Sequence, residues 1–389
     1  MIFATILLDF MGFSILIPVL PTVLVDLGAD AVDVAVVLAL YVIAMVVFLP
    51  FWGWVSDRIG RRPVLLACLL GTAASFAVMA VAQTLATFYV ARVLAGFFGA
   101  SVGTAQAYIT DITSEDERAG GIGMIGAASA MGALFGPALG GLLLNVDPAL
   151  PFYVPVAIAL IAFAAALFFL PESRAASPEM NGWKGLARTF VPTPLLVFFA
   201  SHDNRTRLYL YLFLHVFAAF AALEGMFPLY AAARFEWAEV EVGLFLSLIA
   251  ISFALTQLVL VARLSQLIGE VGLSAIGLGL CSLGLLGLGE THTVWVMVAA
   301  AIVTAVGTGL WFPTFTSMFS KACGSADEAG EYMARSVAMS QTGRGLGIIV
   351  GGLAHQHIAP GAEFTLGGIG VALALAILLA GLPMLAPKR

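Results

Sequence analysis

Four ionisable side chains lie inside long apolar stretches of this sequence, where a charge is costly unless it is paired, solvated or functional. Asp9 and Glu224 are carboxylates, and Arg92 and Arg344 are guanidinium groups. Desolvation favours the protonated form of a carboxyl group, so an acid in such a place is suited to exchanging protons. An arginine keeps its charge and needs a carboxylate, an anion or water beside it. Asp9, Arg92 and Glu224 are therefore the candidates for proton coupling.

Each candidate also has a structural alternative. Asp9 lies near one end of its apolar stretch, where water would solvate it. Arg92 would reach water by snorkelling if it lay near the outer interface. Glu224 is followed by Arg234 and would then line an outer vestibule. His215 lies nine residues before Glu224 and points to the opposite helical face, so a structural role is expected for it.

Polar side chains at helical spacing extend the set of candidates. Gln341 and Arg344 are three residues apart and share a helical face. They would hold an anionic group or a carboxylate such as Glu224, or form a structural pair between spans. A stripe at spacings of four and three residues joins Arg92, Gly96, Gly99, Gly103, Gln106 and Thr110. The predicted substrate-binding residues are Asp9, Gln106, Glu224, Gln257, Gln341 and Arg344.

The stretches that carry these residues are long enough to cross a bilayer. Of the 389 residues, 61% are hydrophobic and only 10% are charged, against about 25% charged in soluble domains. Lipid offers backbone groups no partners, so the stretches must be helices, and the alternating strands of a barrel are absent from the sequence. Twelve spans are predicted, at residues 2–24, 34–55, 63–83, 86–110, 119–144, 150–170, 206–232, 239–264, 268–289, 293–319, 333–356 and 364–386.

Basic residues are distributed unequally between the two sides. Of the 17 Lys and Arg residues, Arg234 alone lies in the loops of one side, and Arg92 and Arg344 fall inside spans. The rich side is cytoplasmic by the positive-inside rule, with both termini there. We expect a monomeric, multi-pass protein of the inner membrane that binds a small molecule and protons. No nucleic acid, metal or cofactor is expected, and the proton gradient is the energy source.

The chain divides into two similar halves. A polar stretch at residues 171–205 is predicted to link six-helix bundles at residues 1–170 and 206–389. A repeat displaced by 211 residues supports this, because Gly132, Gly136, Gly140 and Gly141 recur as Gly343, Gly347, Gly351 and Gly352. The predicted fold class is an all-α membrane protein with twelve transmembrane helices in two six-helix pseudo-repeat bundles, with the binding site between the halves.

A short charged turn between the second and third spans resembles the loop signature of the major facilitator superfamily. It reads Gly53-x3-Asp57-Arg58-x-Gly60-Arg61-Arg62. Arg92-x3-Gly96 is similar to the fourth-span motif of that superfamily, which is associated with proton transfer. Its antiporter motif is resembled by Gly123, Gly132, Gly136, Pro137, Gly140 and Gly141. The first half is similar to the tetracycline/proton antiporters and their drug-exporting relatives through Leu8-Asp9, Ile17–Pro21 and Ala107–Thr113.

The resemblance implies a proton-coupled antiporter that exports small amphipathic compounds or drugs by alternating access. It implies that Asp57 caps the eleventh span and that Arg61 pairs with Asp111. Together these close the cytoplasmic side as a latch of Gly53, Asp57, Arg58, Gly60, Arg61, Arg62 and Asp111. The second-half copy has Gln266 in place of Asp57 and nothing basic matching Arg61. We therefore expect the latch on one half only.

Three positions depart from the tetracycline exporters. Ser75 and Cys281 stand where those proteins carry an acid, and Phe253 stands where they can carry a histidine. These differences argue against tetracycline as the substrate. The alternative within the same fold is a proton-coupled symporter or facilitator of a metabolite or lipid. An intramembrane enzyme or a receptor is disfavoured, because the sequence offers no paired metal ligands, no nucleophile with its base and only short loops.

Overall fold

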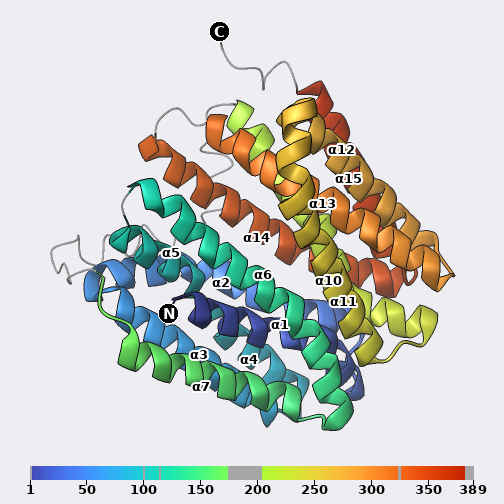
Figure 1. Cartoon of the computed structure of the whole chain (residues 1–389). Coiled ribbons are helices and arrows are strands. Elements are labelled where there is room, and N and C mark those ends of the chain that lie inside the picture. The colour runs from blue at the N-terminus through green and yellow to red at the C-terminus, as the bar shows by residue number, and fades with distance from the viewer. Residues whose placement is uncertain (1, 100, 114, 174–203, 323–325, 382–389) are drawn as a thin grey trace. The chain divides into compact units, whose positions relative to one another are not determined.

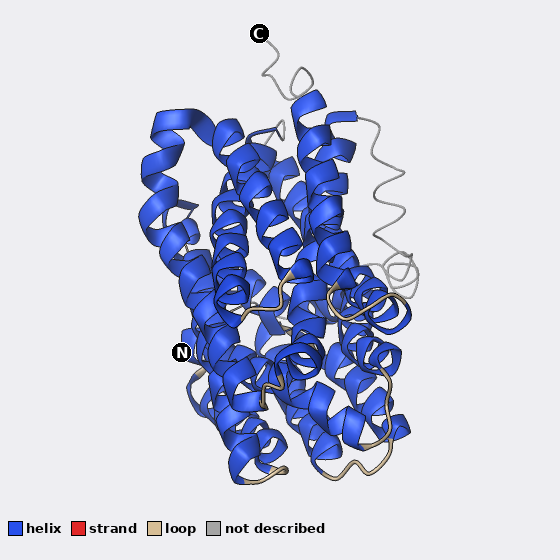
Figure 2. Ribbon diagram, turned by 90° about the vertical axis from the view of Figure 1, so that its right-hand side faces the viewer, coloured by secondary structure: helices blue, strands red, loops and turns tan. Residues whose placement is uncertain are grey.

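The computed structural model describes residues 2–99, 101–113, 115–173, 204–322 and 326–381 (Figure 1). Within these ranges the chain forms helices joined by short connections and no strand (Figure 2). The helices are α1 (Ile2–Asp26), α2 (Ala31–Ile59), α3 (Arg61–Ala80), α4 (Leu85–Phe98), α5 (Ser101–Ile112), α6 (Glu115–Val146), α7 (Leu150–Phe169), α10 (Asn204–Phe235), α11 (Glu239–Leu255), the π-helical η1 (Thr256–Val261), α12 (Ala262–Glu290), α13 (Val294–Ala322), α14 (Ala326–His357) and α15 (Ala362–Ala380).

Ten segments of the described chain are long and apolar enough to cross a membrane. One of them, Glu239–Glu290, has 52 residues and holds two crossings, since one crossing needs about 20 residues. Its backbone breaks at Gly269, where φ is 76°. The more polar α14 supplies the remaining span. Each of the twelve predicted spans thus contains a helix, although some predicted ends, such as residues 82–83, fall in the connections.

The fourth predicted span is described as two helices on either side of residue 100. α4 ends at Phe98, and Gly99 closes it with ψ of 18° and a hydrogen bond from its N–H to the Gly96 carbonyl. Glycine has a low helix propensity, and this segment carries three glycines. The polar stripe that begins at Arg92 can therefore be followed only within each helix and not as one continuous face.

The chain contains two compact units. Unit 1 comprises Met1–Ala29, Leu40–Pro192 and Ala238–Ser247, and unit 2 comprises Asp30–Ala39, Thr193–Trp237 and Leu248–Arg389. In unit 1, α6 lies along α1 and α7 lies along α3. In unit 2, α14 lies along α10 and α12 lies along α13. Most of the predicted linker at residues 171–205 lies outside the described residues.

The repeated glycines make equivalent helix contacts in the two units. In unit 1, a Cβ at Gly136 would collide with Ser14 of α1, and Gly132 and Gly140 approach the same helix. In unit 2, a Cβ at Gly347 would collide with Ala218 of α10. Residues without side chains let helix backbones approach closely. The repeat seen in the sequence is therefore also a repeat in packing.

The last glycine of each repeat faces a different helix. A Cβ at Gly141 would collide with the backbone of Glu239 in α11, within unit 1. A Cβ at Gly352 would collide with Ala35 of α2, within unit 2. Each glycine-bearing helix, α6 or α14, is thus fixed against two neighbours.

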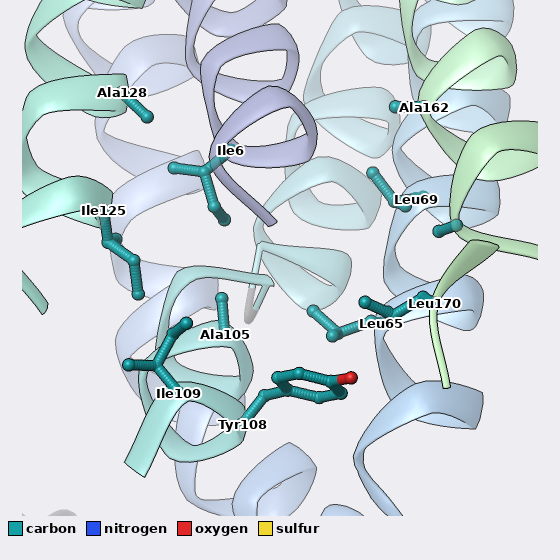
Figure 3. Close-up of a cluster of buried hydrophobic side chains, with 11 residues drawn as sticks. Ile6, Leu65, Leu69, Ala105, Tyr108, Ile109, Ile125, Ala128, Ala162 and Leu170 are labelled. Atoms are coloured by element: carbon teal, nitrogen blue, oxygen red, sulfur yellow. The ribbon is translucent and has the colours of Figure 1, made fainter. Parts of the chain in front are cut away.

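A cluster of buried apolar side chains holds the helix ends of unit 1 together (Figure 3). Ile6 of α1, Leu65 of α3 and Tyr108 of α5 belong to it. The Tyr108 hydroxyl also donates a hydrogen bond to the Pro171 carbonyl at 2.9 Å. Because Asp111 follows Tyr108 by almost one turn of α5, this cluster positions its carboxylate.

Candidate functional site

The charged turn before α3 is built around Gly60, whose φ is 101°. A side chain there would also collide with the carboxylate of Glu172. That carboxylate accepts hydrogen bonds from the backbone N–H groups of Arg61, at 2.9 Å, and Arg62. A carboxylate is stabilised at a helix N-terminus by the free N–H groups and the helix dipole. Nothing in the sequence points to Glu172, because it belongs to no motif and lies 111 residues from Arg61.

Arg61 is the centre of this turn. Its side chain is 8% exposed, its Nε lies 3.0 Å from Oδ2 of Asp111, and its Nη1 lies 2.7 Å from Oδ1 of Asp57. Nη1 also donates to the Ser56 hydroxyl at 3.0 Å. The implied Arg61–Asp111 pair is confirmed. The predicted cap of Asp57 on the eleventh span stays a prediction, because the side chains at the start of α14 lie outside those described.

The remaining residues of the predicted latch have different surroundings. The guanidinium of Arg58 lies 4.6 Å from the ring centre of Trp54. Arg62 donates to the carbonyl of Leu167 at 2.5 Å. Gly53 has open space where a Cβ would stand. Close packing within the described residues therefore does not explain glycine at this position.

The corresponding turn in unit 2 carries charges of opposite sign. Gly269 has φ of 76°, and Glu270 follows it as Arg61 follows Gly60. The Glu270 carboxylate lies 2.7 Å from Nζ of Lys321 and accepts a hydrogen bond from Ser317. The motif itself has no copy in unit 2, but an ion pair of inverted polarity stands at the corresponding place. That the latch belongs to one half only stays a prediction.

Arg92 of α4 is buried, with 2% of its surface exposed. Its guanidinium lies 4.7 Å from the ring centre of Tyr41 and 5.8 Å from that of Phe13, and these two rings stack at 4.8 Å. Aromatic faces attract cations, most strongly away from water. A Cβ at Gly96 would collide with the Tyr41 carbonyl, so this glycine permits α4 to approach the rings. A snorkelling side chain is not placed in this way.

Asp9 lies close in sequence to Phe13, one of these two aromatic residues. It is half-buried on α1 and precedes Phe13 by four residues, so the two side chains share a helical face. The guanidinium of Arg92 lies 5.8 Å from the ring centre of Phe13. Phe13 is thus one turn of α1 from Asp9 and also close to Arg92.

Glu224 and Arg344 form a bidentate pair between α10 and α14. Nε of Arg344 lies 3.1 Å from Oε2 of Glu224, and Nη2 contacts Oε1. The two side chains are 22% and 24% exposed, so the pair is reachable and yet mostly desolvated. Of the alternatives that the sequence left open for Arg344, the structure shows a carboxylate partner, Glu224. Gln341 lies three residues before Arg344 and is half-buried.

Aromatic rings extend from this ion pair along α10. Phe217 precedes Glu224 by seven residues, or two turns, so it lies on the same face. Its ring centre lies 5.7 Å from that of Phe312 and 6.1 Å from that of Trp311, both on α13. Composition alone did not distinguish these rings from the other aromatic residues of the chain.

The other predicted residues stand apart from these pairs. Gln106 is exposed on α5, and Gln257 is half-buried in the π-helical turn η1. His215 contacts the Tyr211 hydroxyl at 3.2 Å. Gly123 lies outside the residues whose side-chain surroundings are described. In the part of the chain that is described, no group of three His, Cys, Asp or Glu residues could hold a metal ion.

The antiporter-type segment of α6 combines a proline with hydroxyl partners. Pro137 has no N–H and disrupts the hydrogen bonds of the preceding turn. Ser14 and Ser247 donate to the carbonyls of Gly132 and Leu134 in that turn, each at 2.7 Å. These bonds lie on either side of the Ala133 carbonyl, which Pro137 leaves without its helical N–H partner, and they hold α6 against its neighbours.

The class of protein is a membrane transporter. Its apolar helices pair through repeated glycine contacts, charged pairs lie inside the spans, and a glycine turn stands at equivalent points of each repeat. The model of the Major Facilitator Superfamily matches residues 2–352 and 232–389, and the chain belongs to this superfamily.

The chain is similar to resistance proteins of bacteria. It is 32% identical over 318 residues to the class E tetracycline resistance protein of Escherichia coli, covering 81% of this chain and 77% of the relative. It is 27% identical over 348 residues to multidrug resistance protein 1 of Bacillus subtilis (strain 168), covering 88% and 86%.

Solved structures show the same fold at lower identity. The human organic anion transporter MFSD10 (TETRAN) matches with a TM-score of 0.76 and 24% identity over 97% of both chains. The peptide transporter POT in complex with sulfate matches with a TM-score of 0.79 and 16% identity over 99% of this chain and 94% of that one.

Proposed function

We propose that the protein exports small amphipathic compounds or drugs in exchange for protons. The observation that carries the proposal is the pairing of an acid with an arginine inside the spans. Glu224 binds Arg344 directly, and Asp9 lies one turn from the ring that Arg92 covers. A carboxylate in such a place changes its charge when it takes up a proton, while the arginine keeps its own. The kinship with tetracycline and multidrug resistance proteins supports export.

Alternating access would couple these charges to transport. Protonation of Asp9, with Glu224, favours one access state, and substrate favours the other, because coupling requires that each ligand bind the two states differently. The Arg61 pairs with Asp57 and Asp111 act as the latch of the cytoplasmic side. The protein lies in the inner membrane as a monomer, with both termini in the cytoplasm.

Substrate-induced proton movement in liposomes tests the proposal. Purified protein is reconstituted with a pH-sensitive dye inside, and candidate drugs are added under an imposed pH gradient. We expect drugs to drive proton flux with the parent protein, and Asp9→Asn to abolish uphill transport while leaving downhill movement. Uphill transport by Asp9→Asn at the rate of the parent would remove Asp9 from the coupling site.

The direction of transport is a separate measurement. Accumulation in everted but not in right-side-out vesicles is expected of an exporter. The reverse result would favour the proton-coupled symporter of a metabolite or lipid.

A further inference from the structure

The Glu224–Arg344 pair is electrically complete before any substrate arrives. Two parallel hydrogen bonds join the guanidinium to the carboxylate, and the two formal charges cancel. Such bidentate pairs are strong and directional. A substrate that binds here must therefore replace what each partner loses.

A singly charged substrate cannot do so. A cation that binds Glu224 displaces Arg344 and leaves a guanidinium without its carboxylate. An anion that binds Arg344 leaves the carboxylate of Glu224 bare instead. In a mostly desolvated site, leaving a charge without a partner costs far more free energy than replacing one partner by another.

We propose that the Glu224–Arg344 pair selects zwitterionic substrates, which replace both partners at once. The ammonium group of the substrate takes the place of Arg344 at Glu224, and its carboxylate takes the place of Glu224 at Arg344. Every charge remains paired, and the net charge of the site does not change. This inference rests on the proposed export function and names the substrate class of that same site.

The aromatic rings of α10 and α13 indicate the rest of the molecule. Phe217 lies about 10 Å along the helix axis from Glu224, since seven residues rise about 1.5 Å each. Phe217 and Phe312 are half-buried, and the buried Trp311 backs Phe217. An aromatic body of about this length fits the distance between the ion pair and these rings.

Protons and zwitterions would exclude each other at this pair. A protonated Glu224 is neutral and no longer offers a carboxylate to the substrate ammonium group. The substrate would then leave Arg344 and Glu224 with an excess positive charge and one poor contact. Mutual exclusion of proton and substrate at one residue is what an exchange mechanism requires.

One aromatic scaffold in three charge forms tests the proposal on the parent protein. Norfloxacin is a zwitterion, its methyl ester is a cation and its N-acetyl derivative is an anion. Affinities are measured by tryptophan fluorescence, and transport by proton flux in liposomes. We expect the zwitterion to bind about tenfold to a hundredfold more tightly than either other form, as the loss of one hydrogen bond to a charged group predicts. Equal affinities for the zwitterion and the cation would overturn the proposal.

Two single variants and their combination separate charge recognition from misfolding. Glu224→Gln should remove the preference for zwitterion over anion, and Arg344→Gln the preference for zwitterion over cation. The combined variant leaves no unpaired charge and should bind all three forms alike. Glu236→Gln removes an exposed carboxylate outside the helices and should keep the preferences of the parent. A preference for the zwitterion that survives in the combined variant would place recognition elsewhere.

The proposed function is tested separately in the same liposomes. Ethidium, a permanent cation without a carboxylate, serves as a second transport probe. If ethidium drives proton flux while the zwitterion shows no advantage over the other two forms, the selection of zwitterions is refuted and the proposed export function stands. An absence of proton flux with any of the four compounds counts against the exporter itself.

Discussion

The two glycine turns, at Gly60 and Gly269, share a backbone and differ in charge. Both glycines have positive φ and are followed by a charged residue that begins a helix. Arg61 bonds Asp111 in unit 1, and Glu270 bonds Lys321 in unit 2. The sign of each charge is reversed between the two turns. What the repeat preserves is therefore a complementary pair between neighbouring helices and not a particular residue.

The comparison also explains a substitution between the two copies. Gln266 stands where Asp57 stands in unit 1. Asp57 binds Arg61 in the next turn of the backbone, whereas an aspartate at position 266 would face the like charge of Glu270. Like charges at this spacing destabilise each other. The loss of the aspartate thus follows from the inversion of the pair.

The two ion pairs differ in how much they contribute to the stability of the protein. Arg61 is 8% exposed and contacts two carboxylates, while Lys321 is 68% exposed and contacts one. Exposed ion pairs contribute about 0–1 kcal/mol, but breaking a buried one costs about 3–5 kcal/mol. The turn of unit 1 is therefore the stronger clamp.

The largest difference is expected from neutralising each turn. Arg61→Gln leaves Asp57 and Asp111 without their cation and should lower transport in liposomes about tenfold or more, given the cost of a broken buried pair. Substrate affinity of the purified variant should stay near that of the parent if the turn acts as the proposed latch and not as a binding site. Glu270→Gln is the matched change in unit 2 and should lower transport much less. Equal losses in the two variants would contradict the ranking.

Inverting the polarity of unit 1 sharpens the comparison. Arg61→Glu combined with Asp111→Lys restores a pair of the kind found in unit 2 but places a new carboxylate beside Asp57. Adding Asp57→Gln should recover about 1 kcal/mol or more of stability over the double variant, because the like-charge contact is removed. Thermal unfolding in detergent measures the three variants. A triple variant no more stable than the double one would show that complementarity is not what the turn preserves.

Removing each glycine is expected to have a smaller effect. Gly60→Ala and Gly269→Ala both force alanine into an extended conformation with positive φ that is essentially restricted to glycine, which costs about 1–3 kcal/mol. Only Gly60→Ala also pushes against Glu172, which bonds the first N–H groups of α3. Gly60→Ala should therefore lower the melting temperature more than Gly269→Ala does. A larger fall in melting temperature for Gly269→Ala would indicate that Glu172 moves aside at little cost.

The smallest effect is expected at Lys321. Lys321→Gln removes an exposed partner from Glu270, and Ser317 keeps its hydrogen bond to that carboxylate. The free energy of unfolding should change by less than about 1 kcal/mol, and the change should shrink further in high salt. Chemical denaturation at two salt concentrations measures this. If Lys321→Gln lowered the free energy of unfolding as much as Arg61→Gln does in the same measurement, the two ion pairs would be equivalent.

Much of the fold and part of the site could be predicted from the sequence. Long apolar stretches determine helices because lipid allows little else. The glycine repeat predicted equivalent contacts, and the positions of Glu224 and Arg344 made their pairing one of several alternatives. Glu172, the rings around Arg92 and the Glu270–Lys321 pair were not foreseen. These are contacts between distant segments, and neither periodicity nor a motif specifies which side chains meet there.

Arg92 has a consequence for the response to membrane voltage. Its charge lies against the rings of Phe13 and Tyr41, which do not take up or release a proton at this contact. An arginine does not lose its proton in proteins. Any displacement of α4 along the membrane normal would carry one positive charge through the transmembrane field, worth about 2.3 kcal/mol for a full crossing at 100 mV. Because Arg92 keeps its charge beside these rings, the transmembrane potential acts on α4 in addition to the pH gradient.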